Sequence, residues 1–252
     1  MIQPLSFYIH LIQDKILRFQ YKKADCRYSR NISNGSAIIM FHHVGEHQPS
    51  DVSDSCFSSI GEFKTLLEWL KKNKRVVPID VLYQNIVAGV IPDNEIVLTF
   101  DDVPSNFFSV SARILKEYGM PYTIYIATGF LNNAGYLSKD ELITLSKESL
   151  CTVGSHTVSH YKLREKGVDV QDEIRRSKLV LEQLINKEVV HFAYPYGTPF
   201  AVSSKNVKVV QASRLYHTAV STIPGYINNN TIQKRYFLPR IHSRLFTKEF
   251  IK

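Results

Sequence analysis

The chain has 252 residues, with 31 Lys and Arg against 23 Asp and Glu, and a formal net charge of +8 at pH 7. Its 44% hydrophobic residues, 11 Gly, 10 Pro and 3 Cys exclude a disordered chain, a collagen-like chain and a disulfide-rich scaffold. The positive charge is compatible with an acidic partner such as nucleic acid, an anionic glycan or a membrane surface, and equally with simple solubility.

The first 22 residues carry apolar side chains at helical spacing. The stripe repeats every three or four residues and consists of Ile2, Leu5, Ile9, Ile12, Ile16 and Phe19. We expect residues 1–35 to form an amphipathic helix and a linker, and residues 36–252 to form one globular domain. The simplest interpretation packs the helix on that domain. A dimer seam and a peripheral membrane contact through residues 1–22 are the alternatives.

The cellular location is predicted only from the absence of membrane-spanning and export signals in the sequence. There is no apolar run of about 18 residues that would span a membrane. The first residues also lack the basic start and small-residue cleavage site of a signal peptide. Three scattered cysteines form no disulfide framework. We therefore expect a cytoplasmic protein, with membrane association through residues 1–22 as the alternative.

From residue 36 onward, short apolar strands alternate with amphipathic helices. Strands are predicted at residues 37–41, 76–77, 95–100, 122–127, 151–153, 189–193, 218–221 and 237–241. Helices are predicted at residues 60–72, 79–88, 105–118, 170–186 and 203–213, with one more that starts after Ser138. Such alternation predicts a parallel sheet, and about seven βα repeats favour a barrel, closed or incomplete.

Local signals mark three of the helix ends. Ser138 and Glu141 have the spacing of a capping box at the start of one helix. Gly119 is expected to end the helix predicted at residues 105–118. Ser105 or Asn106 is expected to cap the start of that helix. These helix ends define where the connecting loops between the predicted strands and helices begin and end.

Polar side chains follow five of the predicted strands at the point where each strand ends. In parallel α/β folds these ends meet on one face, where active sites lie. The residues concerned are His42 and His43, Asp101 and Asp102, Ser155, His156 and His160, Tyr194 to Gly197, and Arg240 with His242. The sequence therefore predicts one polar, metal-capable cluster.

His156 and His160 stand four residues apart, which on a helical turn would put both imidazoles on one side. Two histidines and one carboxylate form a catalytic zinc set that leaves a position for water. Asp101 and Asp102 follow a buried strand, where two carboxylates are costly without a compensating cation. One could bind the metal while the other accepts a proton from water.

Three motifs resemble the polysaccharide deacetylases, carbohydrate esterase family four. They are Thr99-Phe100-Asp101-Asp102, Ser155-His156-Thr157-Val158-Ser159-His160 and Phe192-Ala193-Tyr194-Pro195-Tyr196-Gly197, in the family's order and spacing. The resemblance covers residues 36 to 242. It implies a distorted (β/α)7 barrel, which makes residues 36–252 a polysaccharide deacetylase-like catalytic domain.

The resemblance also implies roles for particular residues. Asp102, His156 and His160 would hold a divalent metal, usually zinc, and Asp101 would be the general base. The backbone N–H of Tyr196 would help to stabilise the oxyanion of the tetrahedral intermediate. The reaction would be hydrolysis of N-acetyl groups on an amino-sugar poly- or oligosaccharide, with release of acetate.

Three departures from the family pattern bear on the site. Val103 stands where the first motif usually has glycine, and Ala193 stands where the third motif often has an arginine that orients the base. Arg240 could replace that arginine from another strand. The late Asp-Trp motif is absent, and the single tryptophan, Trp69, belongs to an early helix.

The general acid is the role with several candidates. In one branch of the family the acid comes from the first strand, and His42 lies in that setting. His43 and His242 are the alternatives, although strand alternation points His43 away from His42. We predict His42 as the acid.

The expected partner is an N-acetylated glycan, and nothing resembles a nucleic-acid groove reader. Two other functions fit the same residues. One is an O-acetyl esterase of the xylan type, or a small-amide hydrolase, using the same metal site. The other is a glycan-binding protein without turnover.

Overall fold

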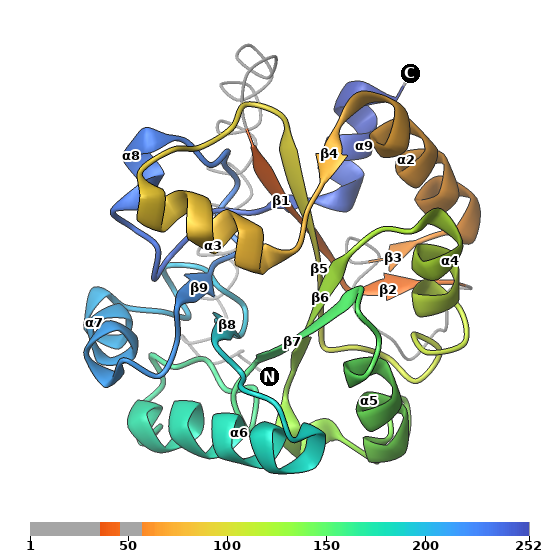
Figure 1. The fold of residues 1–252 in the computed structure, drawn as a ribbon. Helices are drawn as coiled ribbons and strands as arrows, with labels where there is room; N and C mark the ends of the chain where they lie inside the picture. Colours follow the sequence, from red (N-terminus) through yellow and green to blue (C-terminus); the bar gives the residue numbers. More distant parts are fainter. Residues whose placement is uncertain (1–35, 46–56, 252) are drawn as a thin grey trace, which may run out of the picture. The chain divides into compact units, whose positions relative to one another are not determined.

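A computed structural model of the chain describes residues 36–45 and 57–251 (Figure 1). The predicted N-terminal helix and its linker lie outside these residues. The strands are β1 (Ala37–Phe41), β2 (His43–Val44), β3 (Phe57–Ser58), β4 (Arg75–Val76), β5 (Glu95–Asp101), β6 (Tyr122–Ile126), β7 (Cys151–Ser155), β8 (His191–Ala193), β9 (Thr218–Val220) and β10 (Ile241–His242). The helices are α2 (Ile60–Asn73), α3 (Ile79–Ala88), α4 (Ser111–Tyr118), the 3-10 turn η2 (Thr128–Phe130), α5 (Lys139–Ser146), α6 (Val170–Ile185), α7 (Ser204–Ser213), α8 (Asn229–Ile232) and α9 (Ser243–Phe250).

Eight strands form one parallel sheet in the order β10-β1-β5-β6-β7-β8-β9, with β4 pairing to the start of β5. The register brings Ile39 of β1 level with Leu98 of β5 on one side and with Ile241 of β10 on the other. The sheet curls into a half-barrel, and an isolated parallel bridge from Val220 to Leu238 links β9 to the segment that precedes β10. The predicted parallel α/β fold is confirmed.

The two faces of the sheet pack against different helices because side chains alternate along each strand. Ile39, Phe41, Leu98 and Phe100 belong to the larger core cluster, together with apolar residues of α2, α4, α5 and α6. Figure 1 shows α4, α5, α6 and α7 following one another around the strands. These helices cover the outer face of the sheet.

The inner face of the half-barrel packs against α3. Ile79, Leu82 and Ile86 of this helix form a second cluster with inward-facing strand residues, among them Ile38, Val97, Tyr125, Ala193 and Val220. The ring of Tyr125 lies against the backbone of Gly154, where an added Cβ would come within 2.5 Å of the ring. Glycine is therefore required at this point of β7.

Most predicted helix ends are observed, and two boundaries differ. Ser138 and Glu141 form the predicted capping box, and Gly119 ends α4 in the left-handed conformation. The start of α4 was predicted wrongly, because the helix begins only at Ser111. Residues 105–110 form turns, and the Asn106 amide donates to the Val44 carbonyl instead of capping a helix. The last strand covers only Ile241–His242, because the segment before it pairs through a single bridge at Leu238.

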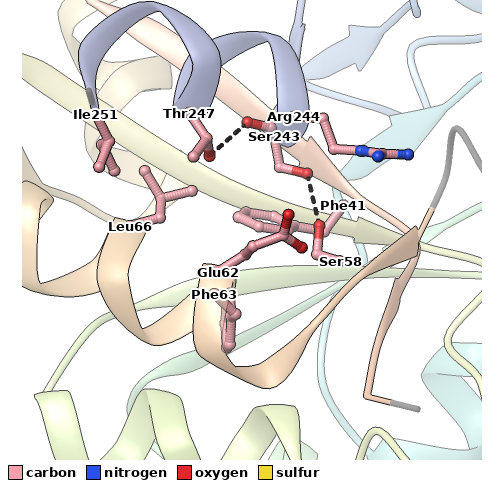
Figure 2. A pocket seen from close by; sticks show the side chains of 9 residues that line it. All are labelled: Phe41, Ser58, Glu62, Phe63, Leu66, Ser243, Arg244, Thr247 and Ile251. Atoms are coloured by element: carbon pink, nitrogen blue, oxygen red, sulfur yellow. Dashed lines mark hydrogen bonds between the residues drawn. The ribbon is translucent and has the colours of Figure 1, made fainter. Parts of the chain in front are cut away.

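A pocket of about 150 Å³ lies between α2 and α9 (Figure 2). Phe41, Phe63 and Leu66 form its apolar side, and the Ser58 and Ser243 hydroxyls hydrogen-bond at 3.3 Å. Phe41 points to the outer face of β1, so this pocket is separate from the residues at the carboxyl ends of the strands. The partly buried Trp69 of α2 packs against the core nearby, with its ring 5.8 Å from that of Phe246 of α9, which gives this tryptophan a packing role. None of the described helices is long and apolar enough to cross a membrane.

Candidate active site

The carboxyl ends of β5 and β7 bring together the three residues predicted to hold a metal. Asp102, His156 and His160 each offer one ligand atom, and these atoms all lie within 4.8 Å of one another. The Asp102 Oδ1 atom is 3.1 Å from Nε2 of His160 and 3.7 Å from Nε2 of His156. Three ligand atoms from three separate positions in the chain therefore converge on one point.

A hydrogen bond fixes the orientation of His156. Its Nδ1 lies 2.7 Å from the carbonyl oxygen of Ala193 in β8, so Nδ1 carries the proton and donates it. The other ring nitrogen, Nε2, then presents its lone pair to Asp102 and His160. This arrangement is typical of metal-ligating histidines, in which the outer nitrogen donates to a carbonyl or a carboxylate.

The loop after β7 brings His160 back toward His156 without a helical turn. Thr157 and His160 adopt positive φ values of 70° and 55°, so the four-residue spacing brings the two imidazoles together through a loop. Glu173 of α6 holds the loop by accepting the backbone N–H groups of Val158 and Ser159 at 2.8 and 2.9 Å. Sequence analysis did not identify Glu173, because an acidic residue in the first turn of a helix has an ordinary role there.

The turn that carries Asp102 is strained. Asp102 and Val103 have φ values of 60° and 32°, and the Val103 N–H donates to the Asp101 carbonyl at 2.7 Å. A β-branched residue at positive φ costs about 1–3 kcal/mol and occurs mostly at functional sites. Burial of the Val103 side chain in the core offsets part of this cost.

The chemistry of these three side chains fits a divalent cation. Oδ1 of Asp102 is buried and accepts no hydrogen bond from the described residues. Burial and the neighbouring His156 lower the pKa of His160 to about 4, so its imidazole is neutral at pH 7. One carboxylate and two imidazoles form a ligand set that zinc takes in catalytic sites.

Asp101 faces Arg240 rather than this cluster. The guanidinium donates to both carboxylate oxygens, at 2.7 and 2.5 Å, and to the Thr99 hydroxyl at 3.2 Å. Both side chains are buried. Burial alone would raise the pKa of Asp101, but the charge and hydrogen bonds of Arg240 hold this pKa well below the usual carboxyl range. Asp101 is therefore ionised at neutral pH.

Arg240 also closes the half-barrel. Its Nε donates to the Ser221 carbonyl after β9 at 2.8 Å, and its backbone N–H donates to the Ile223 carbonyl at 2.9 Å. Ala193, the position where the family often has an arginine, is buried and faces the interior. The guanidinium therefore reaches Asp101 from the residue that precedes β10 instead of from β8.

The three candidate histidines occupy different places. His43 lies in β2, where its ring packs 5.6 Å from that of Phe57, away from the cluster. His42 lies near both carboxylates: burial lowers its pKa, whereas the charges of Asp101 and Asp102 act to raise it. His242 ends β10 and caps α9, and its ring lies 6.1 Å from that of His42. Burial lowers the pKa of His242 to about 3.

Tyr196 forms the exposed wall of the site. Its ring lies 4.9 Å from that of His160, and the Lys162 ammonium lies 5.4 Å from its centre. Tyr196 has a φ of 59°, and the next residue, Gly197, has a φ of 53° with no room for a Cβ beside the Thr222 backbone nitrogen. No hydrogen bond found among the described residues uses the Tyr196 N–H.

Comparison with known proteins identifies the family. The model of the polysaccharide deacetylase family matches residues 89–217, just over half of the chain. The chain belongs to the polysaccharide deacetylase family. The matched residues contain all three motifs of this family of hydrolases, including the one that ends in Asp101 and Asp102.

Relatives and solved structures agree with this assignment. The poly-beta-1,6-N-acetyl-D-glucosamine N-deacetylase of Staphylococcus aureus is 24% identical over 200 residues, which cover 73% of this chain and 66% of that protein. Among solved structures, the Streptococcus pyogenes deacetylase PplD in complex with acetate superposes with a TM-score of 0.73 at 23% identity, over 86% of this chain and 99% of that one. A polysaccharide deacetylase from Bacillus cereus also has a TM-score of 0.73 at 23% identity, over 86% of this chain and 69% of that one.

Proposed function

We propose that this polysaccharide deacetylase is a metal-dependent hydrolase that removes N-acetyl groups from an amino-sugar-containing poly- or oligosaccharide and releases acetate. The observation that carries the proposal is the division of labour between adjacent carboxylates. Asp102 faces two histidines, and Asp101 faces an arginine. The S. aureus relative named above, whose substrate is poly-N-acetylglucosamine, supports an amino-sugar substrate.

Asp102, His156 and His160 would hold the cation, most often zinc in this family. When bound, such a cation polarises a carbonyl oxygen and lowers the pKa of water. The ligand atoms already converge and His156 is oriented by the Ala193 carbonyl, so little rearrangement is needed to form the site.

Asp101 would accept the proton from the attacking water. Its negative charge persists at neutral pH because Arg240 stabilises it, and the two guanidinium hydrogen bonds hold the carboxylate in one orientation. The Tyr196 N–H would donate to the oxygen that becomes negatively charged. His42 would then protonate the departing amine of the sugar, which leaves as a neutral product.

Acetate release tests the proposal. We expect the purified chain to release acetate from oligomers of N-acetylglucosamine, to lose this activity with a chelator and to regain it with Zn²⁺. Elemental analysis should find about one divalent metal per chain, as the single cluster among the described residues implies. Release from acetylated xylan alone would instead indicate an O-acetyl esterase. Glycan binding without any acetate release would indicate a binding protein.

A substitution tests the general acid. We expect His42→Ala to lower kcat by about 10²- to 10⁴-fold, since that is the usual contribution of a positioned acid or base. Its metal content should remain that of the unsubstituted chain, because His42 is not among the three converging ligands. His242→Phe keeps the ring beside His42 and should have a smaller effect. Near-normal turnover by His42→Ala would remove His42 from this role.

A further inference from the structure

A second cavity lies at the amino-terminal end of the sheet, opposite the candidate active site. Its volume is about 390 Å³, and it is lined by Gln211, Arg214, Tyr216, His217, Arg235 and Tyr236. His217 immediately precedes β9, and Gln211 and Arg214 lie at the end of α7. A molecule bound here would not reach the carboxyl ends of the strands.

The lining of this cavity carries positive charge without a matching negative charge. Arg214 and Arg235 both line it, and none of the six lining residues is acidic. Neither arginine forms an ion pair with a carboxylate in the part of the chain that the structure describes, whereas Arg75, Arg175, Arg176 and Arg240 do. Two guanidinium groups that share one cavity repel each other unless an anion lies between them.

The walls of the cavity are held in place by hydrogen bonds and stacking. The Arg235 carbonyl accepts the Ala219 N–H of β9 at 2.9 Å, and the Arg235 guanidinium lies over the Tyr236 ring and donates to its hydroxyl at 3.2 Å. The His217 ring stacks on Tyr83 of α3 at 4.3 Å. The Arg235 guanidinium is thus preorganised, which lowers the entropic cost of binding an anion, whereas the exposed Arg214 side chain is free to close over it.

The backbone conformation at Arg214 allows its side chain to be tested by substitution. This residue ends α7 in the left-handed conformation, with a φ of 55°. Glycine or asparagine is favoured at such a position, and other residues pay a conformational cost there. Glycine at this position would keep the helix end while removing the guanidinium, so Arg214→Gly tests the side chain without straining the backbone.

We propose that this cavity binds a phosphate group, with Arg214 and Arg235 as its charged ligands and Gln211 as an additional hydrogen-bond donor. Guanidinium groups bind phosphate with paired hydrogen bonds, which gives both affinity and orientation. The site would anchor a phosphate-bearing molecule at the end of the barrel away from catalysis.

Titration of the full chain with inorganic phosphate tests the site, at an ionic strength held constant with NaCl. We expect binding in isothermal titration calorimetry to weaken by about 10-fold or more in Arg214→Gly and in Arg235→Gln, because each loses a charge-assisted contact. Arg214→Gly should fold at least as well as the unsubstituted chain, since glycine suits its φ. His160→Ala, at the opposite end of the barrel, should keep the phosphate affinity and so excludes binding at the metal site.

Two sources of phosphate share this chemistry, and two probes distinguish them. If sn-glycerol 3-phosphate binds in an Arg214-dependent manner, the ligand is a soluble or polymer-borne phosphate. If only vesicles containing phosphatidylglycerol do so, it is a lipid headgroup. Equal phosphate affinity in the unsubstituted chain and both arginine variants would overturn the site, as would loss of binding in His160→Ala. A lower Tm of Arg214→Gly with unchanged affinity would assign Arg214 to the helix end alone.

Discussion

Replacing Arg240 by methionine is expected to lower the free energy of unfolding by about 3–5 kcal/mol at pH 7, because it leaves a buried carboxylate without its partner. Arg240 is fully buried and donates to Asp101, Thr99 and Ser221 at once. Urea unfolding of the purified variant measures the effect. Arg176→Met is the matched control. Its surface pair with Asp172 should contribute less than about 1 kcal/mol.

The loss should depend on pH in a defined direction. The pKa of Asp101 is lower in the folded chain than in the unfolded one, so the pair stabilises the fold above pH about 4. This contribution is lost as the pH falls through the folded pKa. The difference between Arg240→Met and the unsubstituted chain should therefore be largest near neutrality and shrink in acid.

Activity gives a readout that a merely structural role would not change. Without Arg240, burial is left as the main influence on Asp101 and raises its pKa. The acidic limb of the kcat/KM profile should then move toward neutral pH. The double variant Asp101→Asn/Arg240→Met should be more stable than Arg240→Met alone, because no buried charge remains unpaired. If Arg240→Met left both the stability and the pH profile unchanged, Arg240 would not be the residue that positions and charges Asp101.

Asp102→Asn should abolish tight metal binding and reduce deacetylation by about 10²- to 10⁴-fold, corresponding to the loss of several kcal/mol of transition-state stabilisation. Asparagine keeps the size of the side chain but removes the charge that both histidines face. Zinc content by elemental analysis and acetate release measure the two effects.

Thermal unfolding separates lost metal binding from misfolding. The metal-free variant should unfold near the Tm of the metal-free unsubstituted chain, because Asp102 Oδ1 accepts no hydrogen bond from the described residues. Added Zn²⁺ should raise the Tm of the unsubstituted chain only. Asp140→Asn, on the exposed first turn of α5, is the matched control and should keep both metal and activity. A variant that retained one tightly bound zinc would show that Asp102 is not a ligand.

Features with local causes were predictable from the sequence. The strand β5 reads as a continuous apolar run, and its residues Ile96 to Phe100 are all buried. The capping box of Ser138 and Glu141 depends on residues three apart, so spacing alone predicts it. The polar residues after β5 and β7 were placed correctly on one end of the sheet, because parallel strands bring these ends together.

Features that depend on distant contacts were not predictable. The observed start of α4 differs from the predicted one because the Asn106 side chain donates to the Val44 carbonyl, 62 residues earlier in the chain. The conformation between His156 and His160 depends on Glu173 and on the backbone around Thr128, neither of which any spacing rule connects to the histidines. The cavity around Arg214 and Arg235 also went unnoticed, since it forms only when α7 and the segment before β10 meet.

The three sequence motifs and the counter-ion of Asp101 lie in different parts of the chain. The three motifs end at Gly197, but the guanidinium that charges and orients Asp101 arrives 43 residues later, as the sequence numbers 197 and 240 show. A nascent or truncated chain that stopped before Leu238 would contain every motif residue and still lack this counter-ion. A chain that ends between Gly197 and Arg240 should therefore hold Asp101 without the guanidinium that neutralises it, and its stability should fall as in Arg240→Met.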